Sequence, residues 1–140
     1  MLVAAQVLLA AWLLVPGQAF RWQPAGAALA AGGVLLGLWA LTANRPGNFR
    51  IVPEIKPGAR LVQTGPYRWV RHPMYTAVLL LTLGGLLCQF APLRLLAWLA
   101  LGAVLYAKTL REERQLSVHF PGYAAYQVRT RRFFPGGPGR

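Results

Sequence analysis

The chain has 140 residues, of which 56% are hydrophobic and only 13% are charged. This composition indicates an integral membrane protein with a single domain, 1–140. The formal charge of +12 is interspersed with apolar runs, so we expect membrane lipids and no nucleic acid as partners. The chain has one cysteine, so no internal disulfide can form, and its three acidic residues and two histidines disfavour a metal site. The sequence implies no obligate protein partner.

Four apolar runs predict four transmembrane helices, at about 1–15, 25–41, 74–90 and 93–110. The predicted fold class is therefore an all-α polytopic membrane protein. Each run is shorter than the roughly 20 residues that cross about 30 Å of hydrocarbon, so interfacial Trp and Tyr or local thinning of the bilayer would complete the helix ends. Gly33 and Gly37 form a GxxxG pair, which predicts the close approach of another helix.

Two polar segments, 42–73 and 111–140, contain most of the charge, and the helical pattern of the fourth run continues to Val118. Of the fifteen lysines and arginines, six lie in 42–73 and seven lie from residue 108 onward. Basic residues accumulate on the cytoplasmic side of membrane proteins, so both segments are predicted to face the cytoplasm from the inner or plasma membrane. Their side chains can then form a single active site on the cytoplasmic side.

The first polar segment ends in the string Gly65-Pro66-Tyr67-Arg68-Trp69-Val70-Arg71-His72-Pro73-Met74-Tyr75. Gly65-Pro66 predicts a turn, and Pro73 suits the first turn of a helix. Arg71 and His72 would then lie at a helix start, where free N–H groups and the helix dipole favour an anionic ligand group. In the alternative interpretation, the two cations simply anchor the helix among lipid headgroups.

Glu112 and Glu113 form an adjacent acidic pair at the end of the fourth helix, in strongly cationic surroundings. They can serve as salt-bridge partners, for instance Lys108 with Glu112 at i,i+4, which contributes only a few tenths of a kcal/mol when exposed. They can instead accept hydrogen bonds from ribose hydroxyls or offset a bound cation. The residue types alone favour neither interpretation.

Several motifs recur with the order and spacing of a known family. The string of residues 65–75 is preceded by Leu61-Val62-Gln63-Thr64 and followed by Glu112-Glu113-Arg114-Gln115-Leu116, Phe120-Pro121-Gly122-Tyr123 and Tyr126. Over roughly residues 48–135 the chain resembles the isoprenylcysteine carboxyl methyltransferase family, and phospholipid methyltransferases share similar motifs. The resemblance implies an integral membrane enzyme that binds S-adenosylmethionine without a Rossmann fold, in a pocket capped by the cytoplasmic C-terminal segment.

The resemblance also assigns expected roles to individual residues. Those expected to line the cofactor are Leu61, Val62, Tyr67, His72, Pro73, Met74, Tyr75 and Glu112. From the chemistry of their side chains, and not from the resemblance, we expect Arg71, Glu113, Arg129 and Arg132 to take part in catalysis. Methyl transfer from a sulfonium needs alignment and a dry site more than acid–base groups. A carboxylate acceptor would be positioned by Arg71 or by the arginines at 129, 131 and 132, whereas an amine acceptor would need Glu113 or His72 as a base.

Two other functions compete with this one. Sterol-reductase-like membrane enzymes carry a similar Arg-His-Pro-x-Tyr segment and bind NADPH, whose extra phosphate would suit the surplus of arginine. A non-catalytic basic helical bundle that binds lipid would explain the charge but not the clustered Tyr, His and Glu. For the methyltransferase, we expect a lipophilic acceptor that enters sideways from the bilayer, because every predicted site residue lies at the cytoplasmic end of a helix.

Overall fold

The structure is a computed structural model that describes residues 1–17, 20–44 and 60–136. Residues 45–59, which include much of the first predicted polar segment, lie outside the described ranges. The described elements are α1 (Leu2–Leu14), α2 (Pro24–Asn44), the short 3₁₀ helix η1 (Gly65–Arg68), α3 (Pro73–Cys88), α4 (Pro92–His119) and α5 (Tyr123–Arg129). The prediction of an all-helical chain is confirmed for these residues.

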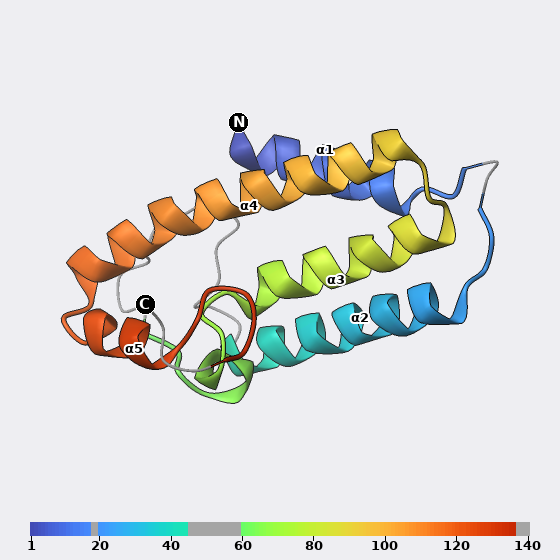
Figure 1. Cartoon of the computed structure of the whole chain (residues 1–140). Helices are drawn as coiled ribbons and strands as arrows, with labels where there is room; N and C mark the ends of the chain where they lie inside the picture. The colour runs from blue at the N-terminus through green and yellow to red at the C-terminus, as the bar shows by residue number, and fades with distance from the viewer. Residues whose placement is uncertain (18–19, 45–59, 137–140) are drawn as a thin grey trace.

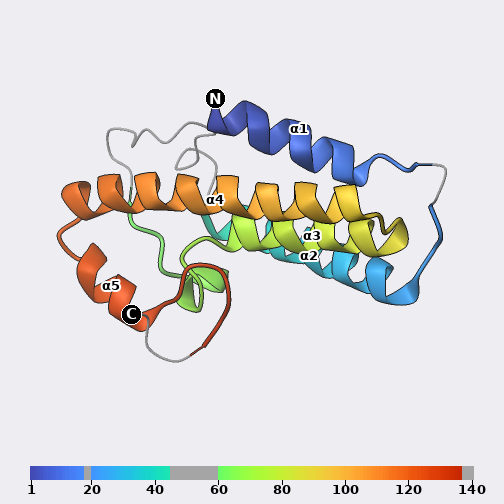
Figure 2. The ribbon, with the colours of Figure 1, turned by 45° about the horizontal axis from the view of Figure 1, so that its top comes forward.

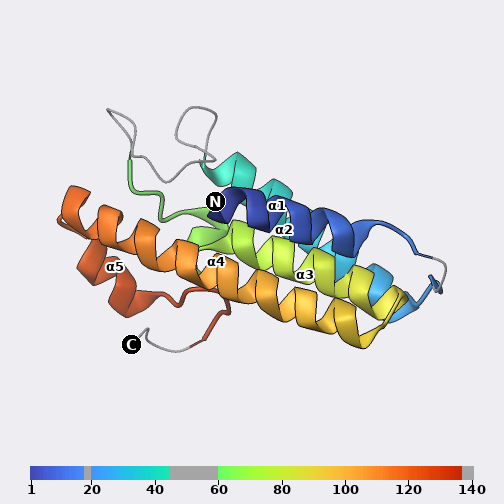
Figure 3. The ribbon, with the colours of Figure 1, turned by 90° about the horizontal axis from the view of Figure 1, so that it is seen from above.

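The helices lie side by side as an elongated bundle (Figures 1 and 2). α2, α3 and α4 alternate in direction, and α1 lies along the first part of α4, as the view in Figure 3 also shows. The α1–α2 and α3–α4 connections meet at one end of the bundle. The N-terminus, the end of α2, the start of α3 and the C-terminal segment all lie toward the other end. The two predicted polar segments are therefore brought together.

The lengths of the helices bear on how many cross a membrane. α2 and α4 are long and apolar enough to span a bilayer, whereas α1 and α3 are shorter apolar helices of 13 and 16 residues. At 1.5 Å per residue these two extend only about 20 and 24 Å. Four spanning helices therefore stay a prediction. α4 runs to His119, so its predicted continuation beyond Leu110 is confirmed.

The segment after α4 contains a helix that the sequence did not predict. α5 follows α4 after a short turn at Pro121 and Gly122. Proline and glycine at this point end α4 and allow the chain to reverse. α5 then folds back beside the end of α4 (Figure 1).

Small residues allow α2 and α3 to pack at very short range. A Cβ atom added to Gly33 would lie 2.6 Å from the backbone nitrogen of Leu81, and one added to Gly26 would lie 2.7 Å from Cys88 Sγ. Gly84 meets the backbone of α2 from the opposite side. We call Gly26, Gly33 and Gly84 the α2–α3 seam. Both members of the predicted GxxxG pair face α3, but the close approach is at Gly33, because a Cβ on Gly37 would make only an ordinary contact with Ala77.

α1 is held to the bundle by an apolar core and by polar groups at its C-terminal end. Leu13, Leu101 and Leu105 are fully buried together between α1 and α4. Gln89 donates to the carbonyls of Leu13 and Val15, and the Arg94 guanidinium donates to the same part of the chain. These donors satisfy carbonyls that a helix end leaves without an intrahelical partner.

The turn before α3 is fixed by a glycine. Gly65 has a φ of +59°, and a Cβ there would lie 2.8 Å from Ala43 Cβ on α2. Both the left-handed backbone and the close approach require glycine. The turn predicted at Gly65-Pro66 is thus confirmed, and it places Trp69 against Trp39 of α2, with ring centroids 5.5 Å apart.

Candidate active site

The described residues after α5, 130–136, bind directly to the residues that precede α3, and we call them the C-terminal segment from here on. The backbone N–H of Arg71 donates to the carbonyl of Arg131 at 2.7 Å, and that of His72 donates to the carbonyl of Arg132 at 3.0 Å. Val70 and Arg131 form a parallel bridge, and Thr76 Oγ1 donates to the carbonyl of Phe133 at 2.7 Å. Two segments about sixty residues apart in sequence therefore lie side by side and form one wall of the candidate site.

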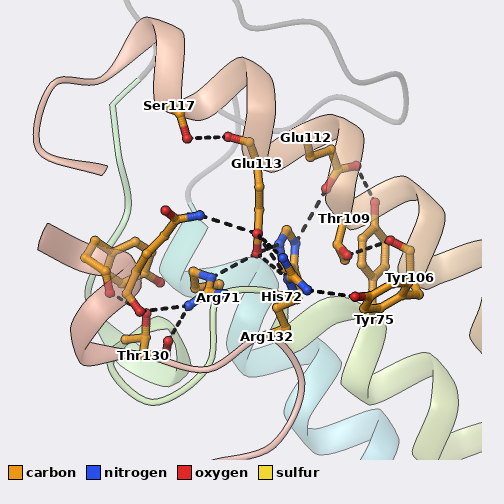
Figure 4. A network of polar contacts seen from close by, with 12 residues as sticks. Arg71, His72, Tyr75, Tyr106, Thr109, Glu112, Glu113, Ser117, Thr130 and Arg132 are labelled. Carbon is orange, nitrogen blue, oxygen red and sulfur yellow. Dashed lines mark hydrogen bonds and ion pairs between the residues drawn. The ribbon is translucent and has the colours of Figure 1, made fainter. Parts of the chain in front are cut away.

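Glu113 of α4 lies at the centre of a buried cluster of charges. Arg71 Nε donates to Glu113 Oε1 at 2.9 Å, and His72 Nε2 lies 3.2 Å from the same oxygen. Arg132 donates to Oε2 from Nη2 at 3.0 Å and from Nε at 3.1 Å. Figure 4 shows Glu113 pointing from α4 toward Arg71 and His72. We call Glu113, Arg71, His72 and Arg132 the Glu113 cluster.

The protonation state of Glu113 follows from these contacts. The residue lies three positions past Leu110, outside the predicted span. Burial alone would raise the pKa of its carboxyl, but hydrogen bonds from His72, Arg132 and Arg71 outweigh burial and lower the pKa to about 2. Glu113 is therefore an anion at neutral pH and already has several donors.

The arrangement corrects one expectation about the start of α3. Free N–H groups were predicted there as a site for an anionic ligand, but the amides of Arg71 and His72 donate to the C-terminal segment, and those of Tyr75 and Thr76 donate to the carbonyl of His72. The Arg71 side chain is buried and also donates to the carbonyls of Gln127 and Thr130. The contacts of the Arg71 side chain therefore favour a role in holding the C-terminal segment in place.

Glu112 faces a different environment from its neighbour. The Glu112 side chain is 23% exposed, compared with 5% for Glu113. Tyr75 Oη donates to Glu112 Oε1, and His72 Nδ1 lies 3.5 Å from Glu112 Oε2. The rings of His72 and Tyr75 are stacked, with centroids 5.6 Å apart. The predicted pair of Lys108 with Glu112 is absent among the ion pairs of the described residues, because Lys108 Nζ donates to Gln6 Oε1 instead.

Tyrosines complete the wall on the side of η1. Tyr126 Oη donates to the carbonyl of Tyr67 at 2.7 Å, which ties α5 to the Gly-Pro-Tyr turn. Burial, with a smaller contribution from Glu112, raises the pKa of Tyr67 to about 12. Burial also raises the pKa of Tyr123 and of Tyr126. All three phenols are therefore neutral hydrogen-bonding groups at physiological pH.

The structure brings together most of the predicted site residues but not all. Six of them form one connected group of hydrogen bonds and ion pairs: Arg71, His72, Tyr75, Glu112, Glu113 and Arg132. Pro73 is buried, whereas Leu61, Val62, Tyr67 and Met74 are half-buried. Arg129 is exposed and donates to Gln63 Oε1 at 3.1 Å, away from the Glu113 cluster. The cofactor and catalytic roles of all these residues stay predictions.

Sequence reasoning missed several residues that support the cluster. Arg132 Nη1 donates to Tyr106 Oη at 3.0 Å, and Gln127 Nε2 lies 3.4 Å from Glu113 Oε2. Tyr106 precedes Glu113 by seven positions, so a helical projection of α4 would have placed both on one face. Gln127 had no such signal, because α5 itself was not predicted. Within residues 1–17, 20–44 and 60–136, no three His, Cys, Asp or Glu side chains gather into a metal-binding group.

Comparison with known proteins identifies the family. The family model described as "Isoprenylcysteine carboxyl methyltransferase (ICMT) family" matches residues 27–118. The chain belongs to the isoprenylcysteine carboxyl methyltransferase family. The resemblance inferred from the motifs is thus confirmed. The matched range runs from α2 almost to the end of α4 and includes His72, Glu112 and Glu113, whereas α1 and the C-terminal segment with Arg132 lie outside it.

Two curated relatives are similar to part of the chain. The cobalt-zinc-cadmium resistance protein CzcN of Cupriavidus metallidurans is 44% identical over 77 residues, which cover 54% of this chain and 35% of the relative. The nickel-cobalt-cadmium resistance protein NccN of Alcaligenes xylosoxydans xylosoxydans is 38% identical over 82 residues, covering 57% and 38% respectively. The chain thus matches little more than a third of the length of either relative. No solved structure matches it.

Proposed function

We propose that the protein is a membrane methyltransferase that moves a methyl group from S-adenosylmethionine to the carboxylate or amine of a lipophilic acceptor, at the cytoplasmic surface of the membrane. Membership of the isoprenylcysteine carboxyl methyltransferase family supports the reaction class. The observation that carries the proposal is the difference in environment between two adjacent carboxylates. Glu113 is buried and neutralised by the protein, whereas Glu112 is partly exposed beside His72 and Tyr75.

The residues around Glu112 fit the chemistry of this cofactor. S-adenosylmethionine offers an ammonium, a ribose diol and a sulfonium, which need hydrogen-bond acceptors, negative charge and aromatic faces. Glu112 supplies a carboxylate, and Tyr67 and Tyr75 supply aromatic rings close to it. We therefore propose Glu112, Tyr67, His72 and Tyr75 as residues that hold the cofactor, with Leu61, Val62, Pro73 and Met74 as its apolar lining. When bound, the cofactor supplies an activated methyl group.

The Glu113 cluster would act by organising this wall. Two guanidiniums and one carboxylate leave the cluster with one net positive charge when His72 is neutral, and the two arginines fasten the C-terminal segment over the start of α3. A fastened segment excludes water, and methyl transfer benefits from a dry, aligned site. Arg132 is the more exposed of the two arginines, so it is the better candidate to meet an anionic acceptor group.

A lipophilic acceptor is supported by the surface of the bundle. Leu35, Leu38, Leu96 and Leu99 are large apolar residues exposed along α2 and α4. Exposed apolar side chains on helices of this length suit a lipid environment. An amphiphile that partitions into the membrane would be held with its headgroup at the depth of the site, which lowers the entropy cost of binding.

Binding measurements in detergent test the proposal. Calorimetry should detect S-adenosylmethionine and not NADPH, and Glu112→Ala should weaken cofactor binding by roughly ten-fold or more, because a charged hydrogen bond is lost. Transfer of a radiolabelled methyl group to prenylcysteines, aminophospholipids and fatty acids, with soluble analogues as controls, then identifies the acceptor class. Binding of NADPH in place of S-adenosylmethionine would support the reductase alternative and overturn the proposal.

A further inference from the structure

A polar residue of α1 contacts the candidate site from outside the region that the family model matches. Apart from Trp12, Gln6 is the only residue of α1 whose side chain has a hydrogen-bonding group. Its Oε1 accepts a hydrogen bond from Lys108 Nζ at 2.7 Å, across 102 residues of sequence. A polar side chain in an otherwise apolar helix is costly in a membrane and usually has a partner or a function. α1 lies before residue 27, where the family match begins.

Lys108 is held in an uncommon environment. Only 6% of the residue is exposed, and none of the ion pairs among the described residues includes it. Its ammonium lies 5.0 Å from the centre of the Tyr75 ring, a cation–π distance. Burying an ammonium is costly unless neighbouring groups stabilise it. Gln6 and Tyr75 contact the ammonium directly, and the negative charge of Glu112 also acts on it.

The contacts continue from Tyr75 to the proposed cofactor wall. Tyr75 Oη donates to Glu112 Oε1, and the Tyr75 ring stacks on His72. Gln6 fixes the ammonium, the ammonium lies on the Tyr75 ring, and the Tyr75 hydroxyl orients the Glu112 carboxylate. Each step is a direct contact between side chains. α1 therefore has an indirect but continuous connection to Glu112.

We propose that Gln6 is a positioning residue of the active site, which acts through Lys108 and Tyr75 on Glu112. This inference rests on the proposed function, because Glu112 and Tyr75 belong to the proposed cofactor wall. It assigns α1 a part in the site in addition to its packing against α4. The control is a polar contact at the opposite end of α1, where the Gln89 side chain donates to the carbonyls of Leu13 and Val15.

The decisive variants are Gln6→Met, which keeps the length of the side chain without an acceptor, and Gln6→Glu, which restores an acceptor oxygen. Gln6→Met should weaken S-adenosylmethionine binding roughly three- to ten-fold, and Gln6→Glu should recover most of that loss. Gln89→Leu should lower the melting temperature and leave cofactor affinity unchanged. Arg94→Gln replaces Gln89→Leu if the latter does not fold.

A second readout follows Lys108 without the cofactor. The chain has two lysines, so lysine labelled with carbon-13 only at Cε gives one NMR signal in a Lys56→Arg background. This signal should move in Gln6→Met and not in Gln89→Leu. Unchanged cofactor affinity in Gln6→Met, or an equal loss in Gln89→Leu, would overturn the positioning role alone. If the wild-type protein binds no S-adenosylmethionine while the lysine signal still moves, the proposed function fails and the inference fails with it.

Discussion

The α2–α3 seam and the Glu113 cluster join parts of the chain by opposite means. In the seam, Gly26, Gly33 and Gly84 bring two backbones together, so that even one added carbon would collide with the other helix. In the Glu113 cluster, long charged side chains join α4 to two irregular segments. The first contact depends on the shape of the helices, and the second depends on charge. Changes of side-chain volume and changes of pH should therefore affect them separately.

The largest expected effect comes from removing the central charge. Glu113→Gln keeps the shape of the side chain but leaves Arg71 and Arg132 without a counter-ion, so it should destabilise the protein by about 3 kcal/mol or more. Unfolding in detergent measures the loss, and faster trypsin cleavage after Arg131 and Arg132 reports release of the C-terminal segment. Glu112→Gln is the matched control. Equal destabilisation by the two variants would contradict a special role for Glu113.

Acid should reproduce this effect in the wild-type protein. Because the pKa of Glu113 is lowered in the folded state, from 4.5 to about 2, the stabilisation is complete above pH 4.5 and is lost as the pH falls from there through about 2. The difference in unfolding free energy between the wild type and Glu113→Gln should be flat above this window and shrink within it. A difference that stays constant across the window would refute the assignment.

A smaller effect is expected in the α2–α3 seam. Gly33→Ala places a methyl group against the backbone of α3 and should cost about 1 to 3 kcal/mol. Gly32→Ala, its neighbour, meets nothing within 4 Å and should instead stabilise α2 by about 0.5 to 1 kcal/mol. Thermal unfolding of both variants measures the contrast. Neither change should alter the pH dependence that Glu113 confers.

The smallest effect concerns Arg129. Because its guanidinium is exposed and bonds only to the Gln63 side chain and the Ala125 carbonyl among the contacts described, Arg129→Ala should change stability by no more than about 0.5 kcal/mol. Arg132→Ala should cost distinctly more. Steady-state kinetics of methyl transfer provide the separate test of the predicted catalytic role, which a rise in KM for Arg129→Ala would support.

The sequence predicted the parts of the molecule that depend on local pattern. Apolar runs located α1 to α4, Pro73 located the start of α3, and Gly65-Pro66 located the turn. The seam was only half predicted, because the close pair on α2 is Gly26 with Gly33 at a spacing of seven rather than a GxxxG pair. Spacing alone does not say how closely each glycine of α2 approaches α3.

The arrangement of the site could be predicted only in part. Motif order grouped His72 with Glu112 and Glu113, but residue types did not show that the Glu113 carboxylate is buried and the Glu112 carboxylate is partly exposed. That difference follows from the docking of the C-terminal segment through a bridge of a few residues. So short a pairing leaves no periodic pattern in the sequence.

The parallel bridge between Val70 and Arg131 can form only late in the synthesis of the chain. At about 5 to 20 residues per second, Arg132 leaves the ribosome several seconds after Arg71. During that interval α3 and α4 are synthesised and Glu113 emerges before Arg132, so Arg71 gains its carboxylate partner before it gains the C-terminal carbonyls. This end of the bundle is therefore assembled last, and a nascent chain that stalls before residue 131 lacks the backbone contacts that join the start of α3 to the C-terminal segment.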